Sequence, residues 1–247
     1  MTQAVQFHDP GEGRLAYRRR DGAGPTVVWL GGFGSDMDGT KAAAFDDWAA
    51  ASGRAFLRFD YSGHGASDGD FADGTITRWR EDALAVIDAQ TQGPLVLVGS
   101  SMGGWLACLV AAVRPDRVAS LLLIAPAADF TSALIEPDLT DDQRRALEDT
   151  GVLERAGEPP FTRRLIEDGA RWNILPGPVP IEVPVRILQG EQDDAVPWRH
   201  ALALHQALKS ADKVFTLIAD GDHRLSRPQD IKRMTSVAEE LLDALQP

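Results

Sequence analysis

The sequence predicts an α/β fold with a doubly wound, mostly parallel sheet and a small helical lid. Short runs of β-forming residues alternate with helical segments along most of the chain. Parallel strands need such crossover helices, because a tight turn cannot connect parallel neighbours. The alternation stops between residues 127 and 184. We therefore expect one domain over residues 1–247, with a lid inserted at about residues 128–180.

The strands and helices of the body can be placed from hydrophobic pattern. Short β-rich runs predict strands at residues 14–19, 26–30, 55–59, 95–98, 118–124, 185–189 and 214–218. Apolar residues at three- and four-residue spacing predict helices at residues 42–51, 78–90, 102–113, 198–209 and 230–245. This order predicts helices on both faces of the sheet.

The lid segment carries helix signals of its own. Thr140 and Gln143 have the form of a capping box, in which each side chain bonds the other residue's backbone N–H. Thr162 is typical of the residue that caps a second helix. Prolines at residues 176–180 cannot continue a helix and indicate a linker that returns to the sheet.

Composition and charge exclude several classes of partner. The net charge of −12 repels phosphate backbones, so we expect no nucleic-acid partner. The first ten residues have neither a basic start nor an apolar stretch, and no run approaches membrane-spanning length. We therefore expect no membrane span and a cytoplasmic location. The one cysteine, Cys108, lies in an apolar run and is expected to be buried and not catalytic.

The strongest functional signal is a Gly-x-Ser-x-Gly pattern between a buried strand and a helix, from Gly99 to Gly103. A nucleophile in such a turn needs strained backbone angles, and small residues two positions to either side let strand and helix pack closely. Only Ser101 fits, because Ser100 lacks glycines at the corresponding positions. We expect Ser101 to be a nucleophile, the alternative being a structural loop.

A serine hydroxyl needs an adjacent base, because it is barely ionised at neutral pH. His223 directly follows the last predicted strand, where a loop at the carboxyl edge of a parallel sheet can reach the nucleophile. His200 and His205 lie five apart on one helix, which is not a same-face spacing, and His8 lies in a polar end segment. His64, in a glycine-bearing loop, could line the site or only pack its loop. We expect His223 to be the base.

A third residue must orient the imidazole and stabilise its charged form. Asp193 follows the penultimate predicted strand and completes the chain order serine, acid, histidine. Asp194 is its close rival, and Asp129, after the preceding strand, ranks third. Each of the three could instead be a solvated loop carboxylate.

A tetrahedral intermediate also needs donors for its oxyanion. The backbone N–H groups of the residue after the nucleophile and of an early strand-to-helix loop supply them. These residues are Met102 and Phe33. Phe33 lies in a glycine-rich loop at residues 29–35, and a turn with no catalytic role would have a similar composition.

At this point the residues resemble the α/β-hydrolase superfamily over nearly the whole chain. More narrowly, residues 58–63, 67–69, 99–105, 193–198 and 222–224 are similar to the family of mitochondrial abhydrolase-domain palmitoyl-protein thioesterases and mycophenolic acid acyl-glucuronide esterases.

The resemblance implies the α/β-hydrolase fold and acyl transfer to water, with Ser101, Asp193 and His223 as the triad, and it favours Asp193 over Asp194. Gly31-Gly32 replaces a common His-Gly dipeptide before the oxyanion residue. The lid segment shows the weakest likeness.

We therefore expect a serine carboxylesterase or thioesterase that acts on a small-molecule or acylated-protein substrate and needs no metal or organic cofactor. Gly32, His64, Trp105 and Trp172 are candidates for substrate binding. Apolar lid residues suggest a hydrophobic acyl group, namely Phe130, Leu134, Ile135, Phe161, Leu165 and Trp172. Arg163 and Arg164 could meet a carboxylate on the leaving group, although an exposed helix face explains them as well.

Two other functions fit the same residues. A carbon–carbon bond hydrolase can use the same fold and triad, and a ligand-binding protein can keep the fold without turnover. Haloalkane dehalogenation is excluded, since it needs an aspartate where Ser101 stands.

Overall fold

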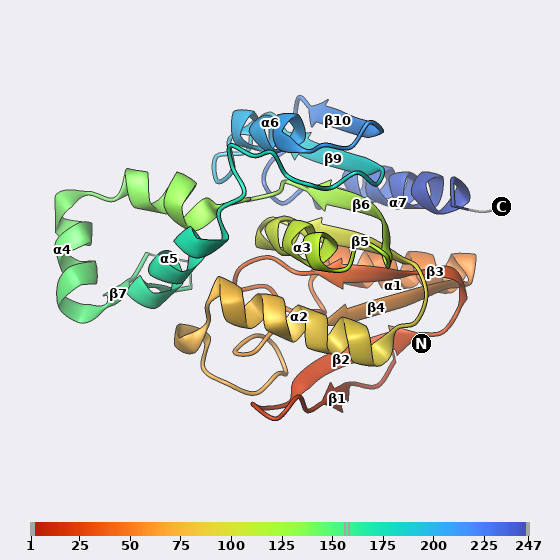
Figure 1. Ribbon diagram of the computed structural model, residues 1–247, viewed down its shortest axis with the longest axis horizontal. Helices are drawn as coiled ribbons and strands as arrows, with labels where there is room; N and C mark the ends of the chain where they lie inside the picture. Colours follow the sequence, from red (N-terminus) through yellow and green to blue (C-terminus); the bar gives the residue numbers. More distant parts are fainter. Residues whose placement is uncertain (1–2, 156, 158, 246–247) are drawn as a thin grey trace.

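A single eight-stranded sheet forms the centre of the body (Figure 1) in the computed structural model, which describes residues 3–155, 157 and 159–245. Its spatial order is β1-β2-β4-β3-β5-β6-β9-β10. The strands are β1 (Gln6–His8), β2 (Leu15–Arg20), β3 (Ala23–Leu30), β4 (Arg54–Phe59), β5 (Leu95–Ser100), β6 (Val118–Ile124), β9 (Val185–Gly190) and β10 (Lys213–Ile218). Among the described strands of this sheet, only the β1–β2 and β2–β4 pairs are antiparallel, so the predicted fold class is confirmed.

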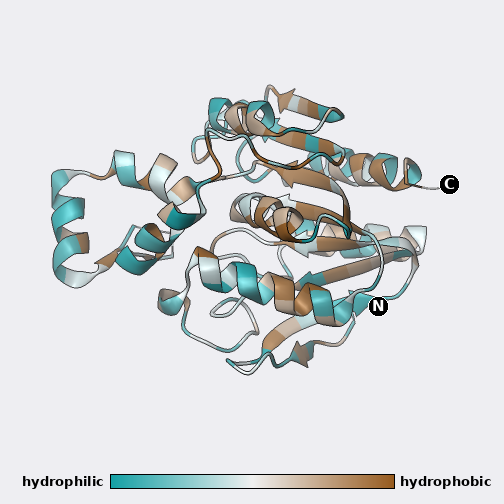
Figure 2. Cartoon of the chain, in the orientation of Figure 1, coloured by the Kyte–Doolittle hydropathy of each residue, from teal (hydrophilic) through white to brown (hydrophobic). Residues whose placement is uncertain are grey.

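Five long helices cover the two faces of this sheet. They are α1 (Thr40–Ser52), α2 (Ile76–Gln90), α3 (Met102–Val113), α6 (Trp198–Ala207) and α7 (Pro228–Asp243). Helices α1 and α7 pack into one core cluster, and α2, α3 and α6 pack into the other. A parallel sheet buried on both faces explains why every residue of β5 is buried. Figure 2 shows the result as brown central strands and a brown α3.

The lid segment leaves the sheet after β6 and returns before β9, on the left of Figure 1. It contains η2 (Thr131–Ile135), η3 (Glu136–Asp138), α4 (Asp141–Thr150), β7 (Val152–Leu153), β8 (Phe161–Thr162), α5 (Arg163–Gly169) and η4 (Ala170–Trp172). The capping box at Thr140 and Gln143 is present, with hydrogen bonds of 3.0 and 3.2 Å. Thr162 caps α5 through the N–H of Leu165.

Two features of the fold were not predicted from the hydrophobic pattern. Strand β1 has three residues, and β7 and β8 have two each. Runs this short show no periodicity, and their pairing depends on neighbours that the tertiary structure supplies. Helices α1, α2 and α7 also begin two residues before their predicted starts, at Thr40, Ile76 and Pro228.

Cys108 is 1% exposed on α3. Burial raises the pKa of its thiol to about 12, so the thiol stays protonated near neutral pH, and a protonated thiol is a poor nucleophile.

None of the described helices is both long and apolar enough to span a bilayer.

Candidate active site

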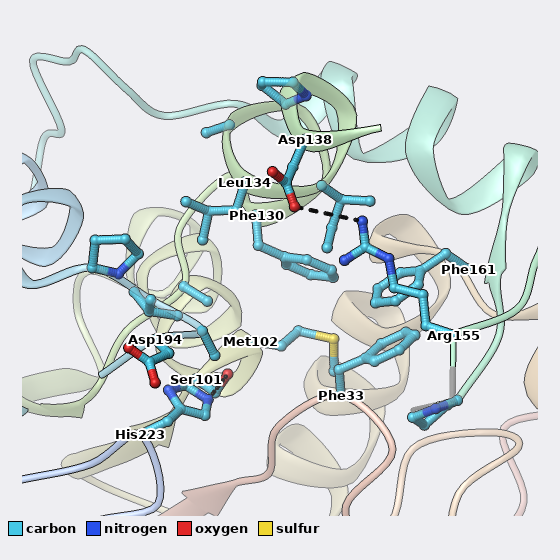
Figure 3. Close-up of a pocket in the computed structure, with 18 of the residues that line it drawn as sticks. Phe33, Ser101, Met102, Phe130, Leu134, Asp138, Arg155, Phe161, Asp194 and His223 are labelled. Atoms are coloured by element: carbon cyan, nitrogen blue, oxygen red, sulfur yellow. Dashed lines mark hydrogen bonds and ion pairs between the residues drawn. The ribbon is translucent and has the colours of Figure 1, made fainter. Parts of the chain in front are cut away.

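Ser101 lies in a strained turn between β5 and α3. Its backbone has φ 55° and ψ −120°, outside the regions that a non-glycine residue prefers. The turn is held by the Ser101 N–H, which donates to the carbonyl of Ile124 at 2.9 Å. Figure 3 shows the Ser101 side chain beside His223 in the wall of the pocket.

The glycines around Ser101 are required by close backbone contacts. A Cβ on Gly99 would lie 2.3 Å from the carbonyl oxygen of Gly103, and a Cβ on Gly103 would lie 2.1 Å from the carbonyl oxygen of Leu30. Both distances are far below van der Waals contact, and both involve backbone atoms that cannot rotate away. The pattern in the sequence therefore reflects strand-to-helix packing.

Replacement of Gly103 by alanine is expected to lower the free energy of unfolding by about 3 kcal/mol, or to prevent folding, because the new methyl group overlaps backbone of β3. Urea unfolding followed by circular dichroism measures this. Gly39→Ala is the matched control, since its Cβ would meet its nearest atom at 3.4 Å, and it should cost less than about 1 kcal/mol. Equal unfolding midpoints for the two variants would contradict the packing argument.

His223 lies in the loop after β10 and contacts both other candidates. Its Nδ1 lies 2.8 Å from Oδ2 of Asp193, and its Nε2 lies 3.2 Å from Oγ of Ser101. An ionised carboxylate only accepts hydrogen bonds, so Nδ1 carries the proton and Nε2 is left to accept one from the serine hydroxyl. The three side chains form one hydrogen-bonded chain.

Asp193 is held in place by four donors. Oδ1 accepts the N–H groups of Ala195 at 3.0 Å and Val196 at 2.7 Å, and Oδ2 accepts from Gln189 at 2.9 Å as well as from His223. Burial alone would raise the pKa of Asp193, but the hydrogen bonds from His223 and Val196 outweigh it and hold this pKa below its usual value. The carboxylate is therefore ionised and rigid.

The two alternative acids, Asp194 and Asp129, have different surroundings. Asp194 is exposed and faces the cavity described below. Asp129 is buried, but its carboxylate accepts the N–H groups of Ile174 and Leu175 at 2.7–3.0 Å and so fixes the end of the lid segment. Only Asp193 of the three is hydrogen-bonded to His223.

The two candidate oxyanion donors belong to segments that adjoin Ser101. Met102 is the first residue of α3, where an N–H has no acceptor within its own helix. The Phe33 loop comes close to the nucleophile, since a Cβ on Gly32 would lie 3.3 Å from Cβ of Ser101. His64 holds this loop by accepting the N–H of Gly34 at 3.2 Å.

None of the four predicted substrate-binding residues is among those that line this cavity, namely Gly32, His64, Trp105 and Trp172. His64 is 4% exposed and packs between Phe71 and Trp79. Trp105 is fully buried, and its indole N–H donates to the carbonyl of Trp172 at 3.2 Å. These rings hold loops and lid together, because their polar atoms are already paired with neighbouring protein atoms.

Trp172 itself donates its indole N–H to Thr77 at 2.7 Å, which ties the lid to α2. Arg163 donates to the carbonyl of Leu147 at 2.7 Å, and Arg164 pairs with Asp73 at 2.9 Å. All three residues therefore make lid contacts and are not among those lining the cavity.

Ser101 and His223 lie in the wall of a cavity of about 740 Å³ between body and lid, a volume typical of small-molecule sites. Four of the apolar lid residues proposed from sequence line it, namely Phe130, Leu134, Ile135 and Phe161. Phe33 stacks on Phe161 with ring centroids 4.8 Å apart. Figure 3 shows these rings beside Ser101. The cavity can hold an apolar group next to the serine.

Lys41 is a residue that sequence reasoning missed. It lies at the start of α1, and its ammonium donates to the carbonyl of Arg224 at 2.6 Å. Burial lowers the pKa of Lys41 to about 8, although the negative charges of Asp222 and Asp193 raise it. Lys41 thus tethers the loop that carries His223. No local pattern marks such a lysine, because its contact spans 183 residues.

Asp60, directly after β4, fixes two loops beside the site. It is 2% exposed and accepts the N–H groups of Met37 at 2.6 Å and Ala66 at 2.9 Å. Burial raises the pKa of Asp60 to about 6, against the lowering effect of these two hydrogen bonds.

This raised pKa predicts a pH-dependent mutational effect. An unfolded aspartate titrates near pH 4, so the folded state binds more protons between about pH 4 and 6, and the contribution of Asp60 to stability falls as pH rises through 6. Asp60→Asn loses a backbone hydrogen bond at every pH, but its penalty should shrink by roughly 1 kcal/mol from pH 5 to pH 7. Urea unfolding of both proteins at the two pH values tests this, and a penalty that grows with pH would contradict the burial argument.

Within the described residues no group of three or more His, Cys, Asp or Glu side chains could hold a metal ion.

The sheet order, the strained serine turn and the cavity at the carboxyl edge define an α/β-hydrolase. The chain matches the model of a hydrolase family described as serine aminopeptidase, S33, over residues 23–150. It is 36% identical over 236 residues to mouse palmitoyl-protein thioesterase ABHD10, mitochondrial, covering 94% of this chain and 80% of that protein.

Two solved structures extend this likeness. Mouse α/β-hydrolase domain-containing protein 10 superposes with a TM-score of 0.92 at 34% identity, covering 98% of this chain and 100% of that one. A protein from Agrobacterium vitis S4, described as a hydrolase, superposes with a TM-score of 0.92 at 45% identity over 97% of this chain and 100% of that one. The chain therefore belongs to the ABHD10-type α/β-hydrolases, and it is an enzyme of the ester-hydrolysing class.

The expected cytoplasmic location is wrong. Relatives from mouse, rat and human at 34–36% identity are all named as mitochondrial proteins. The expectation relied on the lack of a secretory or membrane-spanning pattern, and that lack does not distinguish one aqueous compartment from another.

Proposed function

We propose that this enzyme hydrolyses carboxylic esters or thioesters through an acyl-enzyme on Ser101, with His223 as the base and Asp193 as the acid that orients it. The observation that carries the proposal is the hydrogen-bonded chain from Ser101 Oγ through His223 to Asp193, which opens onto a cavity with aromatic side chains in its wall.

The reaction begins when Oγ of Ser101 attacks the acyl carbonyl carbon and Nε2 of His223 takes the hydroxyl proton. The carbonyl π electrons move to oxygen and give a tetrahedral oxyanion. Asp193 stabilises the imidazolium that forms at the same time, and it remains ionised throughout. The N–H groups of Met102 and Phe33 are the proposed donors to the oxyanion.

Collapse of the oxyanion breaks the bond to the leaving oxygen or sulfur, which receives the proton from Nε2 of His223. A water molecule then gives a proton to His223 and attacks the acyl-enzyme. The second collapse returns the proton to Oγ of Ser101 and releases the carboxylic acid. No metal or organic cofactor enters these steps.

The cavity and the relatives support an apolar acyl group. Phe33, Phe130 and Phe161 form a continuous aromatic wall beside Ser101. The ring centroid of Phe33 lies 5.7 Å from that of Phe130 and 4.8 Å from that of Phe161. Relatives that share 34–36% of their residues are named palmitoyl-protein thioesterases. We infer a thioester or ester of a hydrophobic acid, carried by a small molecule or a protein.

Hydrolysis of p-nitrophenyl esters from two to sixteen carbons, run beside a palmitoyl thioester probe, tests this function. We expect turnover that improves from the acetyl ester to longer chains, because each added methylene is buried in the cavity. Inert wild-type enzyme across the whole panel, together with cleavage of a vinylogous diketone, would overturn the proposal in favour of carbon–carbon bond hydrolysis. Binding of the esters without product release would indicate a non-catalytic protein.

A further inference from the structure

The apolar part of the cavity contains a cation. Arg155 lines the cavity together with Phe33 and Phe161, and its guanidinium carbon lies 5.6 Å from the centroid of the Phe161 ring. Only 20% of the Arg155 side chain is exposed. In Figure 3 its guanidinium lies beside the Phe161 ring, away from Ser101. Such a cation is partly desolvated, so it gains from an anionic partner.

The protein gives Arg155 a weak partner. The carboxylate of Asp138 lies 4.0 Å away, and 81% of that side chain is exposed. A long ion pair with a solvated member contributes little. A carboxylate inside the cavity can bind both arms of the guanidinium at shorter distance, which gives stronger hydrogen bonds. Arg155 therefore has the capacity to bind an anion in the cavity in place of Asp138.

The proposed chemistry decides which part of a substrate meets Arg155. His223 must give its proton to the leaving group, so the leaving group lies on the His223 side of the scissile bond. On that side the cavity is lined by the exposed carboxylate of Asp194, next to Ser101 (Figure 3), and also by Arg224, so the leaving-group side carries both charges. Arg155 lies on the opposite side of Ser101 in the same view. The acyl group is the part that extends towards it.

We propose that Arg155 selects acyl groups that end in a carboxylate, as in the half ester or half thioester of a dicarboxylic acid. The methylenes of such a group contact Phe33, Phe130 and Phe161, and the terminal carboxylate binds Arg155. This specificity rests on the proposed function and narrows its substrate class.

The test compares matched substrates that differ only in terminal charge. One series is the p-nitrophenyl half esters of dicarboxylic acids from six to twelve carbons, and the other has the same chains ending in a primary amide. Shorter acids are left out because their free carboxylate attacks its own ester. At the preferred length we expect kcat/KM to be about tenfold or more higher for the carboxylate than for the amide.

Variants of Arg155 connect this preference to the cavity. The carboxylate-to-amide ratio should fall to about one in Arg155→Met and be partly retained in Arg155→Lys, which keeps the charge but loses the bidentate contact. Asp138→Asn removes the competing carboxylate and should raise the ratio a few-fold. Arg145→Met is the matched control, because this lid arginine is 69% exposed and pairs with Asp142, and it should keep the wild-type ratio.

The outcomes separate this inference from the function on which it rests. A wild-type preference for the amide, or a ratio that Arg155→Met leaves unchanged, overturns the selectivity while the esterase function stands. A wild-type enzyme that hydrolyses neither series overturns both. A preference that disappears in Arg155→Met and persists in Arg145→Met supports the proposal.

Discussion

Replacement of Ser101 by alanine is expected to lower kcat/KM for p-nitrophenyl esters by roughly a thousandfold or more. The variant loses the atom that forms the acyl-enzyme, and the cavity and oxyanion donors that remain supply only residual catalysis. The loss should fall on kcat, because the lining of the cavity is unchanged. Steady-state kinetics of purified wild type and variant measure this directly.

Ser100→Ala is the matched control for this prediction. Ser100 is the last residue of β5 and is 5% exposed, so it neighbours the nucleophile without opening onto the cavity. Its replacement should change kcat by less than about tenfold. Full activity in Ser101→Ala, or an equal loss in both variants, would mean that Ser101 is not the nucleophile.

Replacement of Asp193 by asparagine is expected to lower kcat by roughly ten-thousandfold. Oδ1 accepts two backbone N–H groups, so the amide oxygen of asparagine must take this place and its NH₂ must face His223. An NH₂ group donates to Nδ1, which moves the imidazole proton to Nε2. In that tautomer His223 cannot accept the proton of Ser101.

Asp194→Asn distinguishes this mechanism from a general loss of negative charge. Asp194 is adjacent in sequence but exposed, and its replacement should leave kcat within about tenfold of wild type. If Asp194→Asn were the variant with the large loss, the acid would be misassigned. Nitrogen-15 NMR of the imidazole would report the predicted change of tautomer in Asp193→Asn.

The sheet and the candidate catalytic groups could be predicted because their signals are local. Each parallel strand is a short apolar run, and the serine turn needs glycines at fixed spacing because Gly99 and Gly103 meet backbone atoms. His223 and Asp193 could be proposed because loops that follow parallel strands share one edge of the sheet. Pattern and tertiary structure agree wherever backbone geometry sets the residue type.

The remaining features depend on contacts between distant segments. Arg155 looks like any polar lid residue in sequence, and only the fold brings it next to Phe161 in the cavity. Trp105 and Trp172 have the size expected of substrate-binding rings, but their indole N–H groups are hydrogen-bonded to other protein atoms. Large aromatic residues serve packing and binding equally well, so the residue type alone does not separate the two roles.

The measurement that tests the central claim most directly is labelling with a fluorophosphonate, followed by intact-mass and peptide mass spectrometry. The account predicts one phosphonyl group per chain, located on Ser101, with esterase activity falling in proportion to labelling. Ser101→Ala should take up none, and Asp193→Asn should label far more slowly. Inactivation with the label on another residue, or active enzyme that takes up no label, would contradict the proposed nucleophile.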